Sequence, residues 1–345
     1  MMKKTLLYPY TKRALPLVRF WNELKPGYPL VLSSFSGSGL TGKKAGRAYE
    51  YTTPTTSVYT EEELDKFIDQ IGTCILLPVE QEYDAEVVAN HTHELVEKLK
   101  KNKIEILNFT NDKKVTYPFF ENSSGVKVRE LPMPVIFIGG LVDSSRSFET
   151  FCAALVGLQN AGIQVCAFST YKPAKVFGVN LIDAQPSVDF GIEHLIKSLN
   201  MYIYSCAIKQ NADVVLLDLP SPFLSYSNLT TGDFGVYAYI LSQAVPPDCI
   251  LPCAPLDCFD QDIQRSTLPI MKYRFGQVPC GMVYENCLID YLNTGRGGGL
   301  HKLFVAPDEI ANYSQHLPDS ILSANIADKN ISEKVAKLIL RELEE

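Results

Sequence analysis

The sequence predicts an α/β protein of two domains, each built on a parallel β-sheet. The chain has 345 residues, which is more than one domain of average size uses. Short apolar runs typical of buried strands alternate with longer segments in which apolar residues recur at helical spacing. Strands that alternate with helices in this way favour parallel sheets covered by helices. The alternation stops after residue 111 and resumes at Pro134. We therefore predict domains at residues 1–112 and 134–345, joined by a linker at 113–133.

Composition and charge narrow the functional classes. The chain is 46% hydrophobic and 21% charged, as is usual for a folded globular protein. The formal net charge of −7 gives no basic surface for nucleic acid. No apolar run reaches the roughly 18 residues that a membrane span needs, and the N-terminus has no signal-peptide pattern. We expect a cytoplasmic protein that binds neither nucleic acid nor membrane, and the composition leaves the oligomeric state open.

The first domain is predicted to be Rossmann-like, without the glycine pattern of a dinucleotide site. A helix is expected over Ala14–Leu24, where apolar residues recur at helical spacing, and another over Asp84–Lys100. Thr60 and Glu63 form a capping-box pattern, which predicts a helix carrying apolar residues as far as Ile71. The predicted strands alternate with these helices, at Thr5–Pro9, Tyr28–Ser33, Cys74–Val79 and Ile104–Phe109.

The second domain opens with Pro134–Ile138, a strand whose residues are all suited to burial on both faces. A polar loop follows, and then a helix from Phe148 that ends before Gly162. Further strands are predicted at Gln164–Phe168, Val214–Leu217 and Ile250–Cys253, and further helices at Ser187–Gln210, Asp233–Gln243 and Ser332–Leu343.

The loop after the strand Pro134–Ile138 matches most of the phosphate-loop pattern G-x-x-x-x-G-K-[ST]. A phosphate-binding loop needs a strand, a turn whose amide groups converge, and a helix N-terminus directed at the anion. Gly140 and Ser147 match the pattern, whereas Ser145 replaces the second glycine and Arg146 replaces the lysine. Ser147 keeps the hydroxyl that binds Mg²⁺. Arg146 keeps a positive charge on a planar fork instead of a point charge. Taken alone, the loop fits a phosphate site and an ordinary polar turn equally well.

The strand Val214–Leu217 ends at Asp218, as the Walker-B strand of a nucleotide-binding domain does. A carboxylate at this place reaches Mg²⁺ directly or through water. The domain is therefore predicted to be a P-loop NTPase-like sheet of the SIMIBI type. Its metal contacts, made through a bound nucleotide, would be Ser147 and Asp218.

Tyr171-Lys172-Pro173 follows the second strand of this domain, with Gly178 shortly beyond. These residues, together with the loop, resemble the dethiobiotin synthetase and cobyrinic acid amide synthase group of P-loop proteins, in which the phosphate loop often has one more residue. Gly139 and Ser145 fit that longer spacing. The resemblance implies that Lys172 contacts phosphate and that Asp143 lies near the metal or substrate. The nucleotide- or phosphate-binding residues expected on both grounds are Gly139, Gly140, Asp143, Ser144, Ser145, Arg146, Ser147 and Lys172.

Over nearly its whole length the chain is similar to a family of peptide maturation system proteins from clostridial natural-product gene clusters. Three blocks carry this similarity: Gly37–Gly46, Ile136–Glu149 and Tyr171–Gly178. The resemblance implies that the protein acts beside a radical maturase on a ribosomally made peptide. Its partners would be that enzyme or the peptide.

Other features are interpreted as structural. Gly37–Lys44 is a second near-match to the phosphate loop, but no clear apolar helix follows it, so a solvated turn is slightly favoured over a basic site loop. The nine cysteines contain no C-x2-C pair, and His91 and His93 are two positions apart on a predicted helix. The sequence therefore predicts no disulfide framework and no metal site of its own, while ATP with Mg²⁺ is the expected ligand.

Three functions follow from these residues and from the two resemblances. The preferred one is an accessory protein of ribosomal peptide natural-product maturation that binds a nucleotide or another anion at the degenerate loop Gly140–Ser147. The second is an active ATP-dependent, amide-forming ligase like dethiobiotin synthetase, in which Arg146 and Lys172 bind phosphates. The third is a non-catalytic scaffold that binds a peptide. The altered loop makes efficient hydrolysis doubtful, so the catalytic residues are left unassigned.

Overall fold

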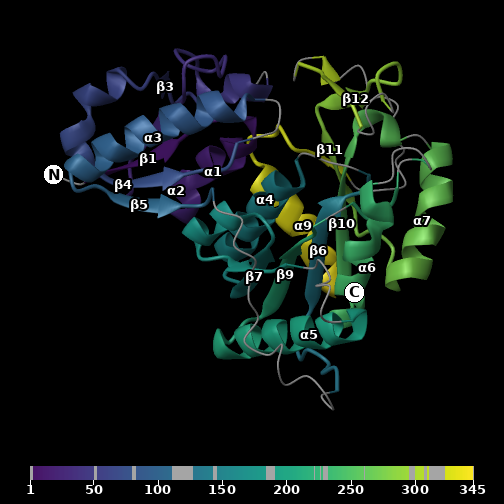
Figure 1. Cartoon of the computed structure of the whole chain (residues 1–345). Coiled ribbons are helices and arrows are strands. Elements are labelled where there is room, and N and C mark those ends of the chain that lie inside the picture. Colours follow the sequence, from purple (N-terminus) through teal and green to yellow (C-terminus); the bar gives the residue numbers. More distant parts are fainter. Residues whose placement is uncertain are drawn as a thin grey trace. The chain divides into compact units, whose positions relative to one another are not determined.

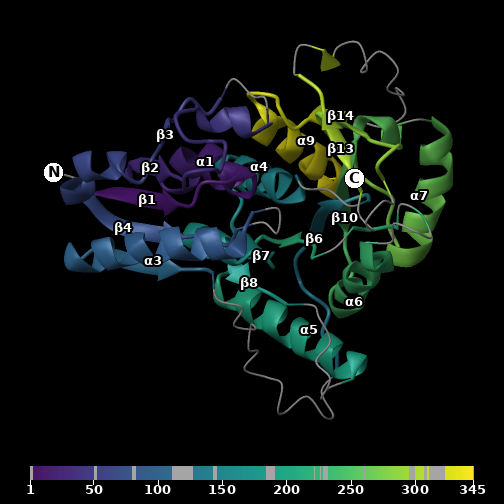
Figure 2. The same cartoon turned by 45° about the horizontal axis from the view of Figure 1, so that its top comes forward.

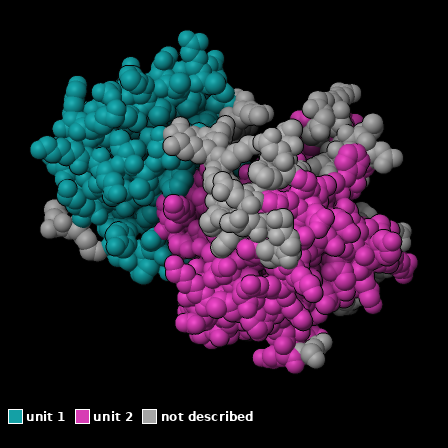
Figure 3. Space-filling view, turned by 60° about the horizontal axis from the view of Figure 1, so that its bottom comes forward, with its two compact units in different colours: residues 1–113 teal, residues 114–345 magenta. Residues whose placement is uncertain are grey.

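The chain forms two compact units, residues 1–113 and 114–345, which Figure 3 distinguishes by colour. The computed structural model describes residues 3–49, 53–79, 83–110, 127–142, 146–183, 191–220, 222–225, 227, 232–259, 261–294, 300–306, 309–310 and 323–344. Both units are α/β, and each is built on a parallel sheet as predicted. No helix among these residues is both long enough and apolar enough to cross a membrane.

The first unit contains a five-stranded parallel sheet in the order β3-β2-β1-β4-β5 (Figure 1). Its strands are β1 (Lys4–Tyr8), β2 (Leu30–Ser33), β3 (Val58–Tyr59), β4 (Ile71–Leu76) and β5 (Glu105–Asn108). The helical segment after β1 is divided into α1 (Leu15–Arg19) and α2 (Trp21–Leu24). The long helix α3 (Ala85–Lys101) begins at Asp84, whose carboxylate accepts two backbone amides as an N-cap. Leu6 and Tyr8 of β1 share a core with Leu95 and Leu99 of α3.

The segment between β3 and β4 differs from the sequence prediction. The capping box forms, because the Thr60 amide donates to Glu63 and the Glu63 amide donates to the Thr60 hydroxyl. Only two short 3-10 helices follow, Glu63–Lys66 and Ile68–Gln70. Ile71 is the first residue of β4 and pairs with Lys4. The predicted helix through Ile71 was therefore wrong, since pairing with β1 recruits this residue into the sheet.

The second unit contains a seven-stranded parallel sheet in the order β14-β11-β10-β6-β9-β7-β8. Its strands are β6 (Val135–Gly140), β7 (Val165–Ser169), β8 (Asn180–Leu181), β9 (Val214–Asp218), β10 (Cys249–Pro255), β11 (Met282–Glu285) and β14 (Ser323–Asn325). A separate antiparallel pair joins β12 (Cys287–Ile289) to β13 (Lys302–Phe304). Every residue of β6 is buried, as expected for a central strand covered on both faces.

Helices cover both faces of this sheet. On one face, α4 (Ser147–Asn160) and α9 (Ile331–Glu344) lie side by side (Figures 1 and 2). Gly157 lets them approach closely, since a Cβ on this residue would lie 2.1 Å from the Ser332 carbonyl oxygen. The other face packs against three helices within one apolar core, namely α5 (Ile192–Lys209), α6 (Val236–Ala244) and α7 (Gln261–Phe275). The unit is thus a three-layer α/β/α arrangement.

Candidate functional site

The order of the seven strands defines where a ligand would bind. The connection after β6 leads to β7 on one side of the sheet, and the connection after β10 leads to β11 on the other side. Ligands of open α/β sheets bind outside the carboxyl ends of the strands at such a switch point. The predicted phosphate loop follows β6 directly and therefore lies at this edge.

The N-terminus of α4 faces this edge. Its first residue is Ser147 and its N-cap is Arg146, which makes no capping hydrogen bond with its side chain. Ser147 is half-buried. A helix start without a side-chain cap keeps amide groups and the positive end of the helix dipole available to an anion. Among the predicted loop residues, Asp143, Ser144 and Ser145 lie outside the described part of the chain.

The two glycines before the loop belong to β6. Ile138 pairs with Asp218 on β9, and Gly140 pairs with Cys253 on β10. A Cβ on Gly139 would lie 3.0 Å from the Leu219 side chain, so glycine permits close packing of the two strand ends. Beyond the strand, the Leu141 amide donates to the Cys253 carbonyl at 2.7 Å. The loop therefore leaves the sheet directly between β9 and β10.

Arg146 lies inside the protein, with 1% of its surface exposed. Its Nε donates to Glu149 Oε2 at 2.6 Å, and a terminal guanidinium nitrogen also contacts this carboxylate. Glu149 is 0% exposed and lies one helical turn further along α4. Burying either charge alone would be unfavourable, so the two are held as a pair. The structure thus places the predicted phosphate-binding arginine beside an acid that balances its charge.

Asp218 ends β9 and is 4% exposed. Its carboxylate accepts a hydrogen bond from the Ser169 hydroxyl at 2.5 Å, and the same Ser169 oxygen accepts the Tyr171 amide at 3.0 Å. The ends of β7 and β9 are therefore linked directly. The burial of Cys152 on α4 raises the pKa of its thiol, and the charges of Asp218 and Glu149 raise it further. The two carboxylates thus act on the same buried region.

Lys172 begins the 3-10 helix η6 (Lys172–Phe177) and is half-buried. The preceding Tyr171 packs edge-on against Phe148 in the first turn of α4, with the ring centroids 4.7 Å apart. This contact brings the Tyr171-Lys172 segment alongside the start of the helix. The structure therefore gathers Arg146, Ser147 and Lys172 with the linked pair of strands β7 and β9.

The other side of the switch point carries a second ion pair that sequence reasoning missed. Glu285 at the end of β11 is fully buried and lies 3.3 Å from Lys302 Nζ on β13. Burial raises the pKa of the neighbouring Cys287 thiol, Glu285 raises it further, and Lys302 and Arg146 oppose this rise. These residues lie far apart in the sequence, and no local motif marks them.

Asn286, between Glu285 and Cys287, is 1% exposed. Neither its amide nitrogen nor its amide oxygen has a hydrogen-bond partner among the described residues. Buried amides are nearly always hydrogen-bonded, so an amide left open on both atoms marks a place where a ligand or water completes the structure. No sequence signal identified this residue.

Within the described residues, no group of three or more His, Cys, Asp or Glu side chains could hold a metal ion. A magnesium ion at this edge would instead use hard oxygen ligands from Ser147, Asp218, water and a bound phosphate. The Ser147 hydroxyl and the Asp218 carboxylate are suitable donors.

The second glycine-rich loop, after β2 in the first unit, uses its amides internally. Gly37, Gly39 and Gly42 have positive φ angles of 95°, 72° and 75°. The amides of Gly42 and Lys43 donate to backbone carbonyls, and the amide of Leu40 donates to the Ser38 hydroxyl. The glycines therefore serve tight turning, and this pattern supports a turn better than a phosphate cradle.

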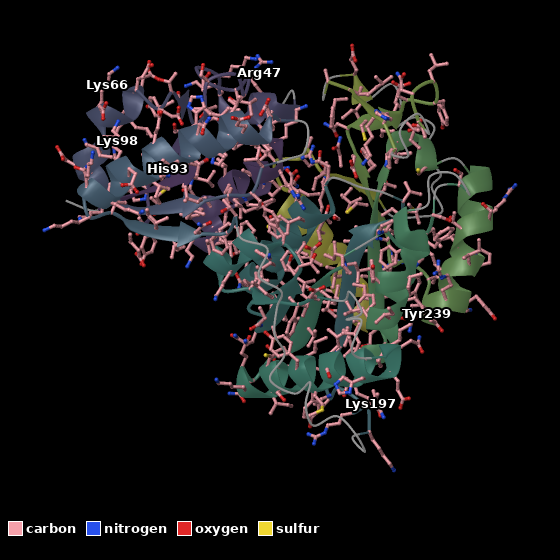
Figure 4. All side chains as sticks on the ribbon, in the orientation of Figure 1. Arg47, Lys66, His93, Lys98, Lys197 and Tyr239 are labelled. Atoms are coloured by element: carbon pink, nitrogen blue, oxygen red, sulfur yellow. The ribbon has the colours of Figure 1, made fainter. Side chains whose placement is uncertain are left out.

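The carboxyl edge of the five-stranded sheet has a polar cluster of its own. The Tyr8 hydroxyl, at the end of β1, donates to Glu61, and Glu61 Oε2 lies 2.7 Å from His91 Nδ1 on α3. Glu61 and His91 side chains are 22% and 29% exposed. His93, on the same helix, is exposed (Figure 4). Burial and the contact with Glu61 raise the pKa of Tyr8 far above its usual range.

Comparisons with known proteins bear on the fold. No family model matches the chain, and no curated protein matches it in sequence. Among solved structures, it is similar to a DUF1611 family protein from Anabaena variabilis ATCC 29413, with a TM-score of 0.56 and 10% sequence identity. The match covers 98% of this chain and 100% of the other. At this identity the likeness shows a shared two-sheet α/β fold.

Proposed function

We propose that the protein is an accessory factor of ribosomal peptide natural-product maturation that binds a nucleotide, or another polyphosphate anion, at the carboxyl edge of the seven-stranded sheet. The start of α4 carries the proposal. It has no side-chain cap and lies at the switch point of a parallel sheet, where Ser147 is its first residue. These are the features that bind phosphate groups in α/β proteins. Lys172 beside the first turn supplies a cation for the phosphates.

Asn286 extends this proposal beyond the phosphates. It follows β11, which is separated from β6 by β10 alone, so about 10 Å separates the two strands. Its amide offers one donor and one acceptor face that the described residues leave open. A neighbouring donor and acceptor of this kind complement the hydrogen-bonding edge of a nucleobase. The separation suits a nucleotide whose phosphates lie at α4.

An accessory role is favoured over turnover because Arg146 is committed to Glu149. A phosphate loop that cleaves ATP has a lysine whose point charge lies between the phosphates. In this chain the corresponding residue is buried and its charge is balanced. Mg²⁺ bound with a nucleotide would neutralise phosphate charge, and Ser147 and Asp218 would hold it. The assignment to peptide maturation is supported by the resemblance of the three sequence blocks named above.

The second candidate is an ATP-dependent, amide-forming ligase. The observation that favours it is the position of Lys172, which lies beside the first turn of α4 because Tyr171 packs against Phe148. In that case Lys172 would stabilise the transferring phosphoryl group in place of the missing loop lysine.

Thermal unfolding of the full chain with ATP and Mg²⁺ tests ligand binding. At 100 times the dissociation constant, a ligand should stabilise the protein by about 2.7 kcal/mol, which raises the melting temperature of a unit of this size by roughly 5–10 °C. Lys172→Ala should reduce the rise. Lys175→Ala is the matched control, since Lys175 is an exposed lysine in the same short helix.

If ATP raises the melting temperature of neither the wild type nor the control, nucleotide binding is excluded and a peptide-binding scaffold becomes the better description. If it binds, phosphate release measured with a candidate peptide separates the two remaining functions. Release above the background of the Asp218→Asn variant would favour the ligase, and binding without release would favour the accessory factor.

A further inference from the structure

Two thiols meet at the opposite edge of the seven-stranded sheet, where the strands begin. Cys249 is the first residue of β10, and Cys280 lies two residues before β11. Ile250 and Pro279 form a parallel bridge, and the Cys280 amide donates to the Ile250 carbonyl at 3.0 Å. Because side chains alternate along a strand, the residue before Ile250 and the residue after Pro279 point to the same face.

The two sulfur atoms are 3.0 Å apart. This contact is close enough for an S–H···S hydrogen bond and needs about 1 Å of further approach to reach the S–S bond length of about 2.05 Å. All nine cysteines of the chain are free thiols in the structure. Among the described residues, Cys249 and Cys280 are the pair for which a direct sulfur–sulfur contact is observed.

The two thiols differ in access. Cys249 is 1% exposed, and its contact with Cys280 together with burial raises its pKa far above the usual range. The nearby carboxylates of Glu342 and Asp248 act in the same direction. Cys280 is half-buried and therefore more accessible than Cys249. An outside reagent therefore reaches Cys280 first, because the thiolate of an accessible cysteine is the nucleophile in disulfide exchange.

We propose that Cys249 and Cys280 form a reversible redox site that reacts with low-molecular-weight disulfides such as oxidised glutathione. In the first step the Cys280 thiolate attacks the disulfide and releases one glutathione thiolate, leaving a mixed disulfide on Cys280. Cys249 then loses its proton to solvent, its sulfur attacks the Cys280 sulfur, and the second glutathione leaves. Two protein thiols are oxidised to one disulfide, and one glutathione disulfide is reduced to two glutathione thiols.

The disulfide would tie the start of β10 to the segment entering β11, and it would close a loop that contains α7. Cross-linking residues 31 positions apart restricts the unfolded chain, so the oxidised form should be the more stable one. The two strands carry Cys253 and Glu285 toward their carboxyl ends. Oxidation would thus join β10 and β11 at the ends opposite the candidate ligand site. The proposal does not depend on what binds at that site.

The test uses the full-length chain, first reduced and then equilibrated with increasing ratios of oxidised to reduced glutathione. Peptide mass mapping without reduction should show one Cys249–Cys280 disulfide, lighter than the reduced pair by two hydrogen atoms, and added dithiothreitol should reverse it. Its rate of formation should rise with pH as the attacking thiolate becomes more abundant. The oxidised protein should melt on the order of 10 °C higher than the reduced one.

Single alanine variants distinguish a true exchange pair from two unrelated thiols. Cys249→Ala should stop the reaction at the mixed disulfide, so glutathione accumulates on Cys280. Cys280→Ala should leave Cys249 unmodified, because the remaining thiol is buried. Cys206→Ala, which removes a half-buried thiol on α5, should leave the disulfide unchanged. Separate glutathionylation of both residues in the wild type, or two free thiols at excess oxidant, would overturn the proposal.

Discussion

The two parallel sheets handle polar groups at their carboxyl edges in opposite ways. At the edge of the seven-stranded sheet, two acid–base pairs lie largely inside the protein, Arg146 with Glu149 and Lys302 with Glu285. In the five-stranded sheet, Glu61 is shared by a buried tyrosine and by a histidine that solvent reaches. Buried pairs hold a preorganised site in a low-dielectric region, whereas accessible groups exchange protons with water.

The difference extends to the helices that follow the strands. In the first unit, α3 begins at an aspartate that caps its amides. In the second unit, α4 begins at Arg146, whose side chain is turned to Glu149 and makes no capping bond. A capped helix start has its donors occupied, while an uncapped start at a switch point has donors for a ligand. The two units therefore differ in whether the N-cap side chain of the helix occupies the first backbone amides.

The largest expected difference between the units is their response to alkaline pH. Burial raises the thiol pKa of Cys152, Cys253 and Cys258 in the second unit, and Cys166, Cys249 and Cys287 share this direction. The folded state then keeps protons that the unfolded state loses above its thiol pKa of about 8.5. The contribution of these thiols to the free energy of unfolding is unchanged below that pH. Above it, the free energy of unfolding falls by about 1.4 kcal/mol per pH unit for each such thiol.

The first unit has one cysteine, Cys74, and burial also raises the pKa of its thiol. The first unit should therefore lose several times less stability at alkaline pH than the second. Urea unfolding at pH 7.5 and 9.5 measures this, because the single tryptophan, Trp21, reports on the first unit by fluorescence and far-UV circular dichroism reports on both. An equal shift of both signals would contradict the prediction. Cys152→Ala should reduce the pH dependence of the unfolding free energy, followed by circular dichroism, by the contribution of one thiol, about 1.4 kcal/mol per pH unit.

Breaking the buried pair of the second unit should have the next largest effect. Glu149→Gln leaves the Arg146 charge without its acid and should lower the free energy of unfolding by about 3–5 kcal/mol. The freed guanidinium should at the same time strengthen ATP–Mg²⁺ binding, so the two measurements should move in opposite directions. Glu333→Gln, at an exposed pair with Lys337 on α9, is the control and should change neither. If Glu149→Gln kept the stability of the wild type, the Arg146–Glu149 pair would not stabilise the fold.

A smaller effect is expected from the shared carboxylate of the first unit. Glu61→Gln should lower the stability of that unit by about 1–2 kcal/mol, because two hydrogen bonds lose their charged acceptor and one of them is to the buried Tyr8. Urea unfolding followed by Trp21 fluorescence measures the change. Tyr8→Phe should give a similar loss and should also remove the part of the stability that declines above pH 10, where unfolded tyrosine ionises.

The smallest expected effect concerns the helix caps. Asp84→Ala removes the side chain that accepts the amides of Glu86 and Val87 and should cost about 1 kcal/mol. Arg146→Ala makes the same change at the N-cap of α4 and should cost more, about 3–5 kcal/mol, because it breaks the buried ion pair and no capping bond. If Arg146→Ala lowered the stability by no more than Asp84→Ala, the contrast between the two helix starts would disappear.

Much of the fold was predictable from the sequence. The β6 run, the loop, α4 and β9 with its terminal Asp218 follow from local periodicity and local motifs, and the structure has them within a few residues. The helix α7 was missed because it contains Pro269 and starts in a polar stretch. The strands β11 to β14 were missed because each has three or four residues, too few to show a period.

The residues of the candidate site also differ in whether a local motif marks them. Ser147, Lys172 and Asp218 were found because each follows or begins an element at a recognisable spacing. Glu149 lies one turn after Arg146, a spacing at which helical side chains meet, so the sequence contained that signal. Glu285, Asn286 and Lys302 carried none, because strand order brings them to the edge. Whether the predicted residues bind phosphate stays a prediction for the titration above.

By itself, the sequence determined that two parallel sheets form and that a polar loop matching part of the phosphate-loop pattern follows the first strand of the second. Local periodicity and turn chemistry decide those features, and each is visible within a few tens of residues. Only the tertiary structure decided that Arg146 is neutralised in the core and that Glu285 and Lys302 share the same edge. It also decided that Cys249 and Cys280 meet at the far edge. The Glu285–Lys302 and Cys249–Cys280 contacts depend on which strands become neighbours. The Arg146–Glu149 spacing is local, and only the burial of this pair depends on the packing of the whole sheet.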